Sequence, residues 1–219
     1  MITLYLIRHG KTTGNMQHRY VGRTDEPLCE DGIRQVYAQK QILGQQFSTK
    51  GDSRPLNRVY ISPMLRCKQT AELLFSGIEQ EAIEDFREME FGAFEYKNYE
   101  ELNGDPRYQA FIDSGGQTDF PEAETQAHFR ERVIRAFAQC VDHMLSHQPQ
   151  NAADQAYAFV VHGGTVMAIL DAYAQPHRPY FDWQIPAGAG YRCELEAAPE
   201  GVYLTHIQRL DPDEEIENL

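Results

Sequence analysis

Two arginines and two histidines stand in short segments whose composition suits the binding of an anion. The stretch LIRHGKTTGN places Arg8 directly before His9, and VVHGG places His162 before two glycines. A third stretch, SPMLRCKQTAE, contains Arg66. Guanidinium groups bind phosphate with paired hydrogen bonds, and glycine lets the backbone approach an anion closely. These segments therefore predict a site for a phosphate group.

The same residue types can also carry out phosphoryl transfer. A phosphate monoester dianion needs several positive donors around its oxygens, which Arg8 and Arg66 can supply. A neutral imidazole at His9 can attack phosphorus and form a covalent phosphohistidine, while His162, if protonated, would stabilise the anion. A carboxylic acid must then protonate the leaving alcohol, and the same group as a carboxylate would activate water.

The charge distribution agrees with a local anion site. The chain has a formal net charge of −13, which disfavours nucleic acid and anionic membranes as partners, so we expect neither. Residues 1–24, however, contain no Asp or Glu and carry a charge of +4. A basic island in an acidic chain is typical of a focused anion site, although chance placement is an open alternative on charge alone.

Buried strands that alternate with helices must position these side chains. The apolar runs Thr3–Ile7, Arg58–Ser62 and Ala158–Gly164 are typical of buried parallel strands. Helices are expected between and after them, one of which would use Ser62 as N-cap and Pro63 as its first residue. The pattern predicts a three-layer α/β/α sandwich, with a mostly parallel sheet and an antiparallel edge pair over residues 190–210. All three polar segments then fall at the carboxyl ends of strands, where such sheets bind ligands.

The chain is predicted to form one domain over residues 1–210, with a lid or insertion at about 85–125 and an acidic tail at 211–219. Four scattered cysteines indicate reduced thiols and a cytoplasmic protein, and no apolar run is long enough to cross a membrane. His143 and His147 have a spacing that can bind metal, but we interpret them as surface residues of a helix end.

Four motifs in order, LIRHGKTTGN, SPMLRCKQTAE, REMEFGAFE and VVHGG, resemble the histidine phosphatase superfamily, the phosphoglycerate-mutase-like proteins. The resemblance runs from Thr3 to about Leu210. It implies the phosphoglycerate mutase-like α/β fold and an enzyme that needs no metal and no other cofactor. That expectation agrees with the lack of an Asp/His ligand cluster in the sequence.

The resemblance also implies roles for single residues. His9 would be the phosphorylated nucleophile, and Arg8, Arg66 and His162 would form the phosphate pocket. Glu88 matches the proton donor, with Glu90 and Glu95 nearby as less favoured carboxylates.

Five further positions match the binding residues of the family. Thr12 and Asn15 match residues that contact phosphate or substrate, and Gly163 matches the backbone after the second histidine. Gly22 and Thr24 lie in a segment that resembles the loop on the substrate side.

The sequence departs from the family pattern near residue 122. The stretch FPEAET keeps a glutamate at Glu124, but Glu122 and Ala123 replace a glycine pair that many phosphatase relatives carry. Lys11 also stands where many relatives have an acid. These changes leave the two-step chemistry possible and put the substrate preference in doubt.

We therefore expect a metal-independent phosphomonoester hydrolase, a monomer or homodimer, acting on a small phosphorylated metabolite. The segment GRTDEPL has a modest resemblance to the alpha-ribazole phosphatase branch, and broad specificity fits equally well. A phosphoglycerate mutase is the first alternative, since it shares the first half-reaction. A non-catalytic binding module is the second, and the joint presence of the nucleophile, proton donor and phosphate-pocket residues argues against it.

Overall fold

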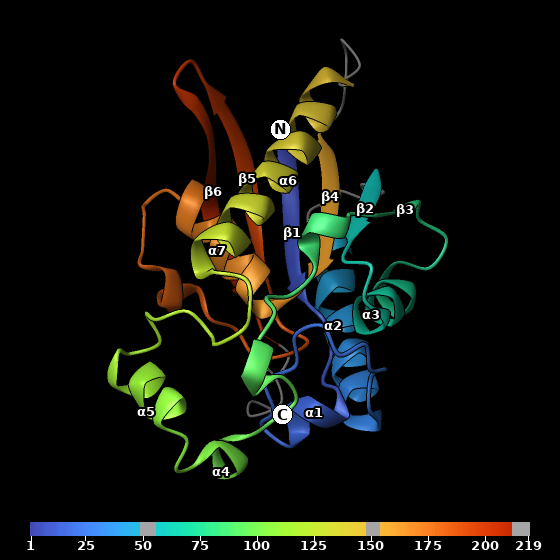
Figure 1. Cartoon of the computed structure of the whole chain (residues 1–219). Coiled ribbons are helices and arrows are strands. Elements are labelled where there is room, and N and C mark those ends of the chain that lie inside the picture. Colours follow the sequence, from blue (N-terminus) through green and yellow to red (C-terminus); the bar gives the residue numbers. More distant parts are fainter. Residues whose placement is uncertain (49–55, 148–153, 212–219) are drawn as a thin grey trace.

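A six-stranded sheet forms the centre of the protein in the computed structural model, which describes residues 1–48, 56–147 and 154–211 (Figure 1). The strand order is β3-β2-β4-β1-β5-β6. The strands are β1 (Ile2–Arg8), β2 (Arg58–Ile61), β3 (Gln80–Ala82), β4 (Gln155–Val161), β5 (Gly190–Ala198) and β6 (Gly201–Leu210). The first four are parallel, whereas β5 and β6 pair in the antiparallel sense. The prediction of a mostly parallel sheet with an antiparallel edge is confirmed.

Helices cover both faces of the sheet, as the apolar strands require. Along β1, Leu4 and Leu6 are buried in one hydrophobic cluster, and Tyr5 and Ile7 in the other. This alternation buries both faces of the strand, because successive side chains point to opposite sides. The first cluster includes side chains of α6 (Gln126–Ser146) and α7 (Gly163–Tyr173), and the second those of α2 (Glu30–Ser48) and α3 (Leu65–Phe75). The three-layer prediction is confirmed.

The predicted start of α3 is wrong by two residues. The helix begins at Leu65 with Met64 as its N-cap, and not at Pro63 behind Ser62. The Ser62 hydroxyl instead lies 2.7 Å from Nε2 of His162. The same hydroxyl also accepts from the amide of Met64 (3.4 Å), and Met64 itself provides no side-chain cap.

Residues 85–125 cross beyond the carboxyl ends of the strands in short elements, in the lower part of Figure 1. They lie in or next to η1 (Glu84–Phe86), η2 (Gly92–Phe94), α4 (Tyr99–Leu102) and α5 (Pro106–Asp113). Phe94, Leu102 and Phe120 of this segment are buried in the larger hydrophobic cluster, and Tyr20 packs against the rings of Phe94 and Phe120. The segment is thus joined to the core by aromatic packing. Its designation as a lid stays a prediction.

Two further observations concern the C-terminal tail and the possibility of a membrane-spanning helix. The predicted acidic tail, apart from Asp211, lies outside the described residues. Within residues 1–48, 56–147 and 154–211, none of the helices combines the length and the apolar character that a membrane span demands.

Candidate active site

The polar segments meet at the carboxyl ends of β1 and β4. Arg8 is the last residue of β1, and the amide of His9 donates to the carbonyl of Val161 at the end of β4 (3.0 Å). His162 follows Val161 and caps the N-terminus of α7. The rings of His9 and His162 meet edge to face with centroids 5.1 Å apart.

His9 is held as a neutral ring with one nitrogen free. Its Nδ1 lies 2.8 Å from the carbonyl oxygen of Gly10, which can only accept, so Nδ1 carries the proton. Nε2 therefore holds the lone pair, as a nucleophile requires. Burial lowers the pKa of His9 well below its ordinary value, and the guanidinium groups of Arg66 and Arg8 lower it further.

His162 lies behind His9 in a buried, neutral state. Its Nε2 bonds to the Ser62 hydroxyl, and Sγ of Cys67 lies 3.6 Å from the same nitrogen. Burial, followed by the charge of Arg66, lowers the pKa of His162 well below its ordinary value. A dianion beside the ring would raise this pKa again, because opposite charge favours the protonated form. Protonation of His162 is therefore tied to anion binding.

Arg66 is buried and Arg8 is half-buried, and both guanidinium groups donate to backbone carbonyls. Arg8 donates to the carbonyl of Ile185 at 2.7 Å, and Arg66 donates to those of Thr24 and Gly22, each at 2.8 Å. The Nε donors of Arg8 and Arg66 are buried without a hydrogen-bond partner among the described residues. An anion can accept from such donors, and its binding would offset their desolvation.

Glu88 is a half-buried carboxyl at the same site. Its oxygens accept from the amides of Met89 (3.0 Å) and Gly164 (3.4 Å). Burial raises the pKa of Glu88 above its ordinary value, despite the opposing effect of these amides and of Arg66 and Arg8. A Cβ on Gly164 would lie 2.6 Å from Oε1 of Glu88, so a larger residue there would require the Glu88 carboxyl to move. A carboxyl that keeps its proton to higher pH suits a general acid.

Two of the predicted binding residues, Asn15 and Gly163, line the main pocket, whereas Thr12 does not. Thr12 and Asn15 form a reciprocal capping box at the start of α1 (Thr13–Met16), with both hydrogen bonds at 3.2 Å. Asn15 also lines the main pocket, whereas Thr12 is fully buried. Gly163 packs against the Arg8 guanidinium, since a Cβ there would lie 3.4 Å from Nε of Arg8.

Gly22 and Thr24, predicted as substrate contacts, are engaged with Glu95 and Arg66. Oε1 of Glu95 accepts from the amide of Gly22 (3.1 Å) and from both the amide and the hydroxyl of Thr24 (2.9 and 2.7 Å). Their carbonyls accept from Arg66. Glu95 thus holds the loop that holds Arg66. The sequence had offered Glu95 only as an alternative proton donor.

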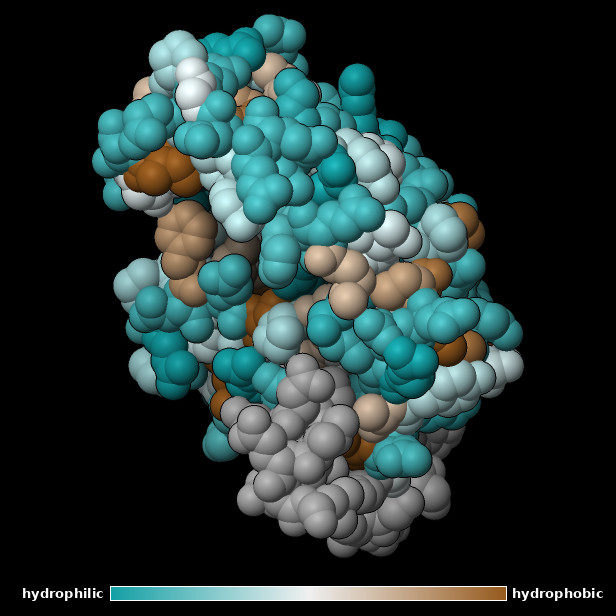
Figure 2. All heavy atoms as spheres, turned by 90° about the horizontal axis from the view of Figure 1, so that it is seen from below, coloured by the Kyte–Doolittle hydropathy of each residue, from teal (hydrophilic) through white to brown (hydrophobic). Residues whose placement is uncertain are grey.

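An open pocket of about 610 Å³ lies next to these residues. Arg8, Asn15, Glu88, Gly163 and Gly164 form its polar wall. Its aromatic lining consists of Tyr20, Phe91, Phe111, Phe120, Phe129, Tyr180 and Phe181. Figure 2 views the molecule from below, and shows a largely hydrophilic face in which separate apolar side chains are exposed. The lining of the pocket thus combines groups that can bind an anion with apolar rings.

The structure brings no metal ligands together in the part it describes. No group of three or more His, Cys, Asp or Glu side chains there is placed to hold a metal ion. His143 and His147 stack with ring centroids 4.2 Å apart, and Nδ1 of His143 lies 3.2 Å from the Tyr60 hydroxyl. The absence of a metal requirement stays a prediction.

Replacing Glu95 with Ala is expected to destabilise the protein by about 2–4 kcal/mol, because it leaves the amides of Gly22 and Thr24 without their acceptor. Urea unfolding measures the change in free energy. Glu100→Ala is the matched control in the same segment. Among the described residues, the Glu100 carboxylate accepts one hydrogen bond, from the hydroxyl of neighbouring Tyr99. Equal stability of the two variants would contradict the role of Glu95.

Comparison with known proteins places this geometry in a family. The model of the histidine phosphatase superfamily (branch 1) matches residues 4–208. A probable phosphoglycerate mutase, GpmB, of Proteus mirabilis (strain HI4320) is 28% identical over 145 residues, which are 64% of each chain. This match spans less than two thirds of that relative's length.

Two solved structures are similar over almost the whole chain. The alpha-ribazole phosphatase of Shigella flexneri is 22% identical, with a TM-score of 0.71 and coverage of 95% of this chain and 96% of that one. The protein TTHB049 of Thermus thermophilus is 28% identical, with a TM-score of 0.62 and coverage of 95% and 99%. At 22% identity, the similarity to the Shigella flexneri structure shows a shared fold alone. Because the family model covers nearly all of the sequence, the chain belongs to the histidine phosphatase superfamily.

Proposed function

We propose that the protein is a metal-independent phosphomonoester hydrolase that works through a phosphohistidine at His9. The observation that carries the proposal is the state of His9, a buried neutral ring with Nε2 free beside two guanidinium groups. Glu88, whose pKa is raised, supplies the matching acid, and it lines the main pocket together with Arg8. Membership of the histidine phosphatase superfamily supports this assignment and indicates an enzyme.

In the first step, Nε2 of His9 attacks phosphorus, and the bond between phosphorus and the alcohol oxygen breaks. Protonated Glu88 gives its proton to the leaving oxygen, so the alcohol departs neutral. Arg8, Arg66 and the amides at the start of α7 receive the charge of the transferring group. His162 takes up a proton from solvent as the dianion binds and donates a hydrogen bond to a phosphate oxygen, and it releases this proton when phosphate leaves.

In the second step, water attacks the phosphorus of phosphohistidine. Glu88, now a carboxylate, accepts a proton from that water, and the bond between phosphorus and Nε2 breaks. Inorganic phosphate and neutral His9 result. The net reaction is hydrolysis of a monoester to an alcohol and phosphate, and the chain returns to its starting protonation state.

The main pocket favours a substrate whose alcohol carries an apolar or aromatic group. Seven aromatic side chains line it, and Glu88 is the one acidic side chain among its described lining residues. Arg19, a cation of the wall, is already paired with both carboxylate oxygens of Glu101. Alpha-ribazole phosphate fits this class through its ring system, and related aromatic or alkyl esters fit it as well.

Phosphoglycerate mutase is the second candidate, on the ground of the GpmB relatives. A phosphoglycerate carboxylate needs a cation besides those that bind the phosphate. With Arg19 occupied, the aromatic wall offers less to such a group than to a ring. A non-catalytic binding module is disfavoured, because His9 and Glu88 both keep the state that catalysis requires.

A pair of substrates with matched leaving groups tests this function. We expect hydrolysis of both propyl phosphate and 3-phenylpropyl phosphate, with kcat/KM about tenfold or more higher for the second, since burying a phenyl ring gains about 1.5–3 kcal/mol. EDTA should leave both rates unchanged. Phosphate release measures hydrolysis, and conversion of 3-phosphoglycerate measures mutase activity. Faster mutase turnover than hydrolysis, or loss of turnover with EDTA, would contradict the proposal.

Glu88→Gln should lower kcat/KM, which reports the phosphorylation step, by about 10²–10⁴-fold for 3-phenylpropyl phosphate and far less for 4-nitrophenyl phosphate, whose leaving group needs no proton. Glu90→Gln is the control in the neighbouring carboxyl. In the wild type, kcat/KM should fall as pH rises through the raised pKa of Glu88, because the acid must be protonated. The variant should lack that decline. An equal loss for both substrates would mean that Glu88 is not the proton donor.

A further inference from the structure

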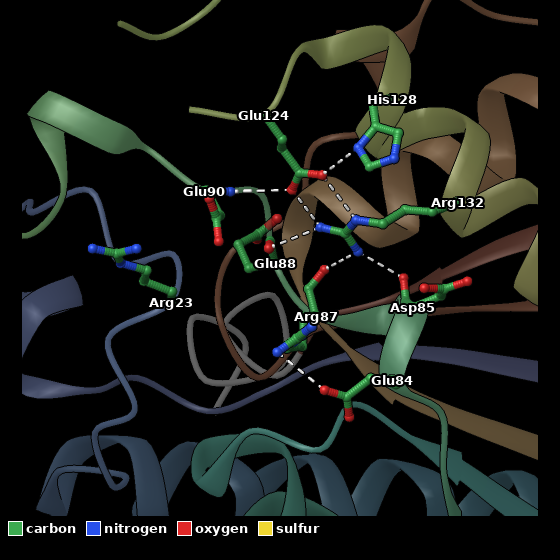
Figure 3. A pocket seen from close by; sticks show the side chains of 9 residues that line it. All are labelled: Arg23, Glu84, Asp85, Arg87, Glu88, Glu90, Glu124, His128 and Arg132. Carbon is green, nitrogen blue, oxygen red and sulfur yellow. Dashed lines mark hydrogen bonds and ion pairs between the residues drawn. The ribbon is translucent and has the colours of Figure 1, made fainter. Parts of the chain in front are cut away.

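The guanidinium of Arg132 holds the backbone that leads into Glu88. Arg132 lies on α6 and is 9% exposed. It donates to the carbonyl oxygens of Asp85 (2.7 Å), Arg87 (2.8 Å) and Glu88 itself (3.1 Å), as Figure 3 shows for the residues around it. One side chain thus fixes three peptide groups of the same short segment.

Glu124 completes this arrangement from the other side. Its two carboxylate oxygens accept from Nε (3.0 Å) and a terminal nitrogen (2.5 Å) of Arg132, and one of them also accepts from the amide of Glu90 (3.2 Å). Burial opposes ionisation of Glu124, but the hydrogen bonds from Arg132 hold its pKa below the ordinary value. The Arg132–Glu124 pair therefore binds the chain before and after Glu88 (Figure 3).

Arg132 does not act on Glu88 mainly through its charge. The cations that act on the Glu88 carboxyl are Arg66 and Arg8, whereas Arg132 meets the backbone of Glu88. Glu88 lines both the main pocket and a smaller pocket of about 320 Å³ that contains Arg132 and Glu124. Glu88 thus lies between the main pocket and the Arg132–Glu124 pair that binds its backbone.

We propose that Arg132 and Glu124 are positioning residues that fix Glu88 where it can protonate the leaving oxygen. The inference rests on the proposed function, since it concerns the proton donor of that reaction. Proton transfer requires close and aligned atoms, and a misplacement of about 1 Å can cost on the order of 10²-fold in rate. The planar fork of arginine reaches carbonyls and carboxylate together, which a lysine ammonium cannot do.

The pair also gives a reason for the glutamate in the stretch FPEAET. Glu124 is the residue of that stretch which binds Arg132, whereas neighbouring Glu122 takes a positive φ of 61°. This left-handed conformation favours glycine, the residue that many relatives carry there. The departure from the family pattern thus falls on a turn, and leaves the positioning carboxylate in place.

Arg132→Gln, Arg132→Lys and Glu124→Gln test the proposal by their dependence on the leaving group. We expect kcat/KM, which reports the phosphorylation step, to fall by about 10–100-fold for 3-phenylpropyl phosphate in Arg132→Gln, and by less than about threefold for 4-nitrophenyl phosphate. Arg132→Lys should restore only a small part of the loss. Glu124→Gln should show the same selectivity more weakly, and it keeps the test open if Arg132→Gln does not fold.

Arg135→Gln is the matched control, because Arg135 lies on the same helix and binds the Asp85 side chain at the surface. It should leave both rates unchanged. Thermal unfolding of each variant separates positioning from loss of stability. An equal loss for both substrates, or full activity of Arg132→Lys, would overturn the proposal.

Glu88→Gln, measured in parallel, separates the proposed role of Glu88 as proton donor from the proposed role of Arg132 and Glu124 as positioning residues. If it lacks selectivity for the poor leaving group, the proposed role of Glu88 fails, and the positioning role fails with it. If Glu88→Gln is selective and the Arg132 and Glu124 variants are not, only the positioning role is wrong.

Discussion

Burial of two positive charges at the ends of parallel strands is the constraint on which this structure depends. Arg8 and Arg66 lie where water cannot solvate them fully, so backbone carbonyls of Ile185, Gly22 and Thr24 take its place. Burial keeps the histidine beside them neutral, and the charges of Arg66 and Arg8 lower its pKa further. The same charges would be costly in an apolar interior and become useful when a dianion arrives.

The segment at 85–125 also contributes two carboxylates, Glu95 and Glu124, that hold the charged groups of the site in place. Glu95 holds the loop whose carbonyls accept from Arg66, and Glu124 pairs with Arg132 to hold the backbone of Glu88. Aromatic packing joins the segment to the core. The phosphate side and the acid side of the site are therefore held by carboxylates of one segment, and its aromatic rings also form part of the wall that meets the substrate.

Much of this arrangement could be predicted from the sequence. Apolar runs that end in polar residues locate Arg8, His9 and His162 at one sheet edge, because parallel strands end together. Glu88 came from the resemblance to a family and not from spacing. The roles of Ser62, Glu95 and Arg132 were missed, since they depend on the paths of loops that bring together residues 44 to 100 positions apart. Local patterns carry no information on such paths.

The central claim is that His9 carries the phosphoryl group, and direct identification of the phosphorylated atom tests it. The Glu88→Gln variant should be mixed with 4-nitrophenyl phosphate and quenched in alkali, because loss of the base slows attack by water and phosphohistidine is stable there. Mass spectrometry and phosphorus NMR should then find one phosphoryl group on Nε2 of His9. A phosphoryl group on another residue, or turnover without any phosphoenzyme, would contradict the account.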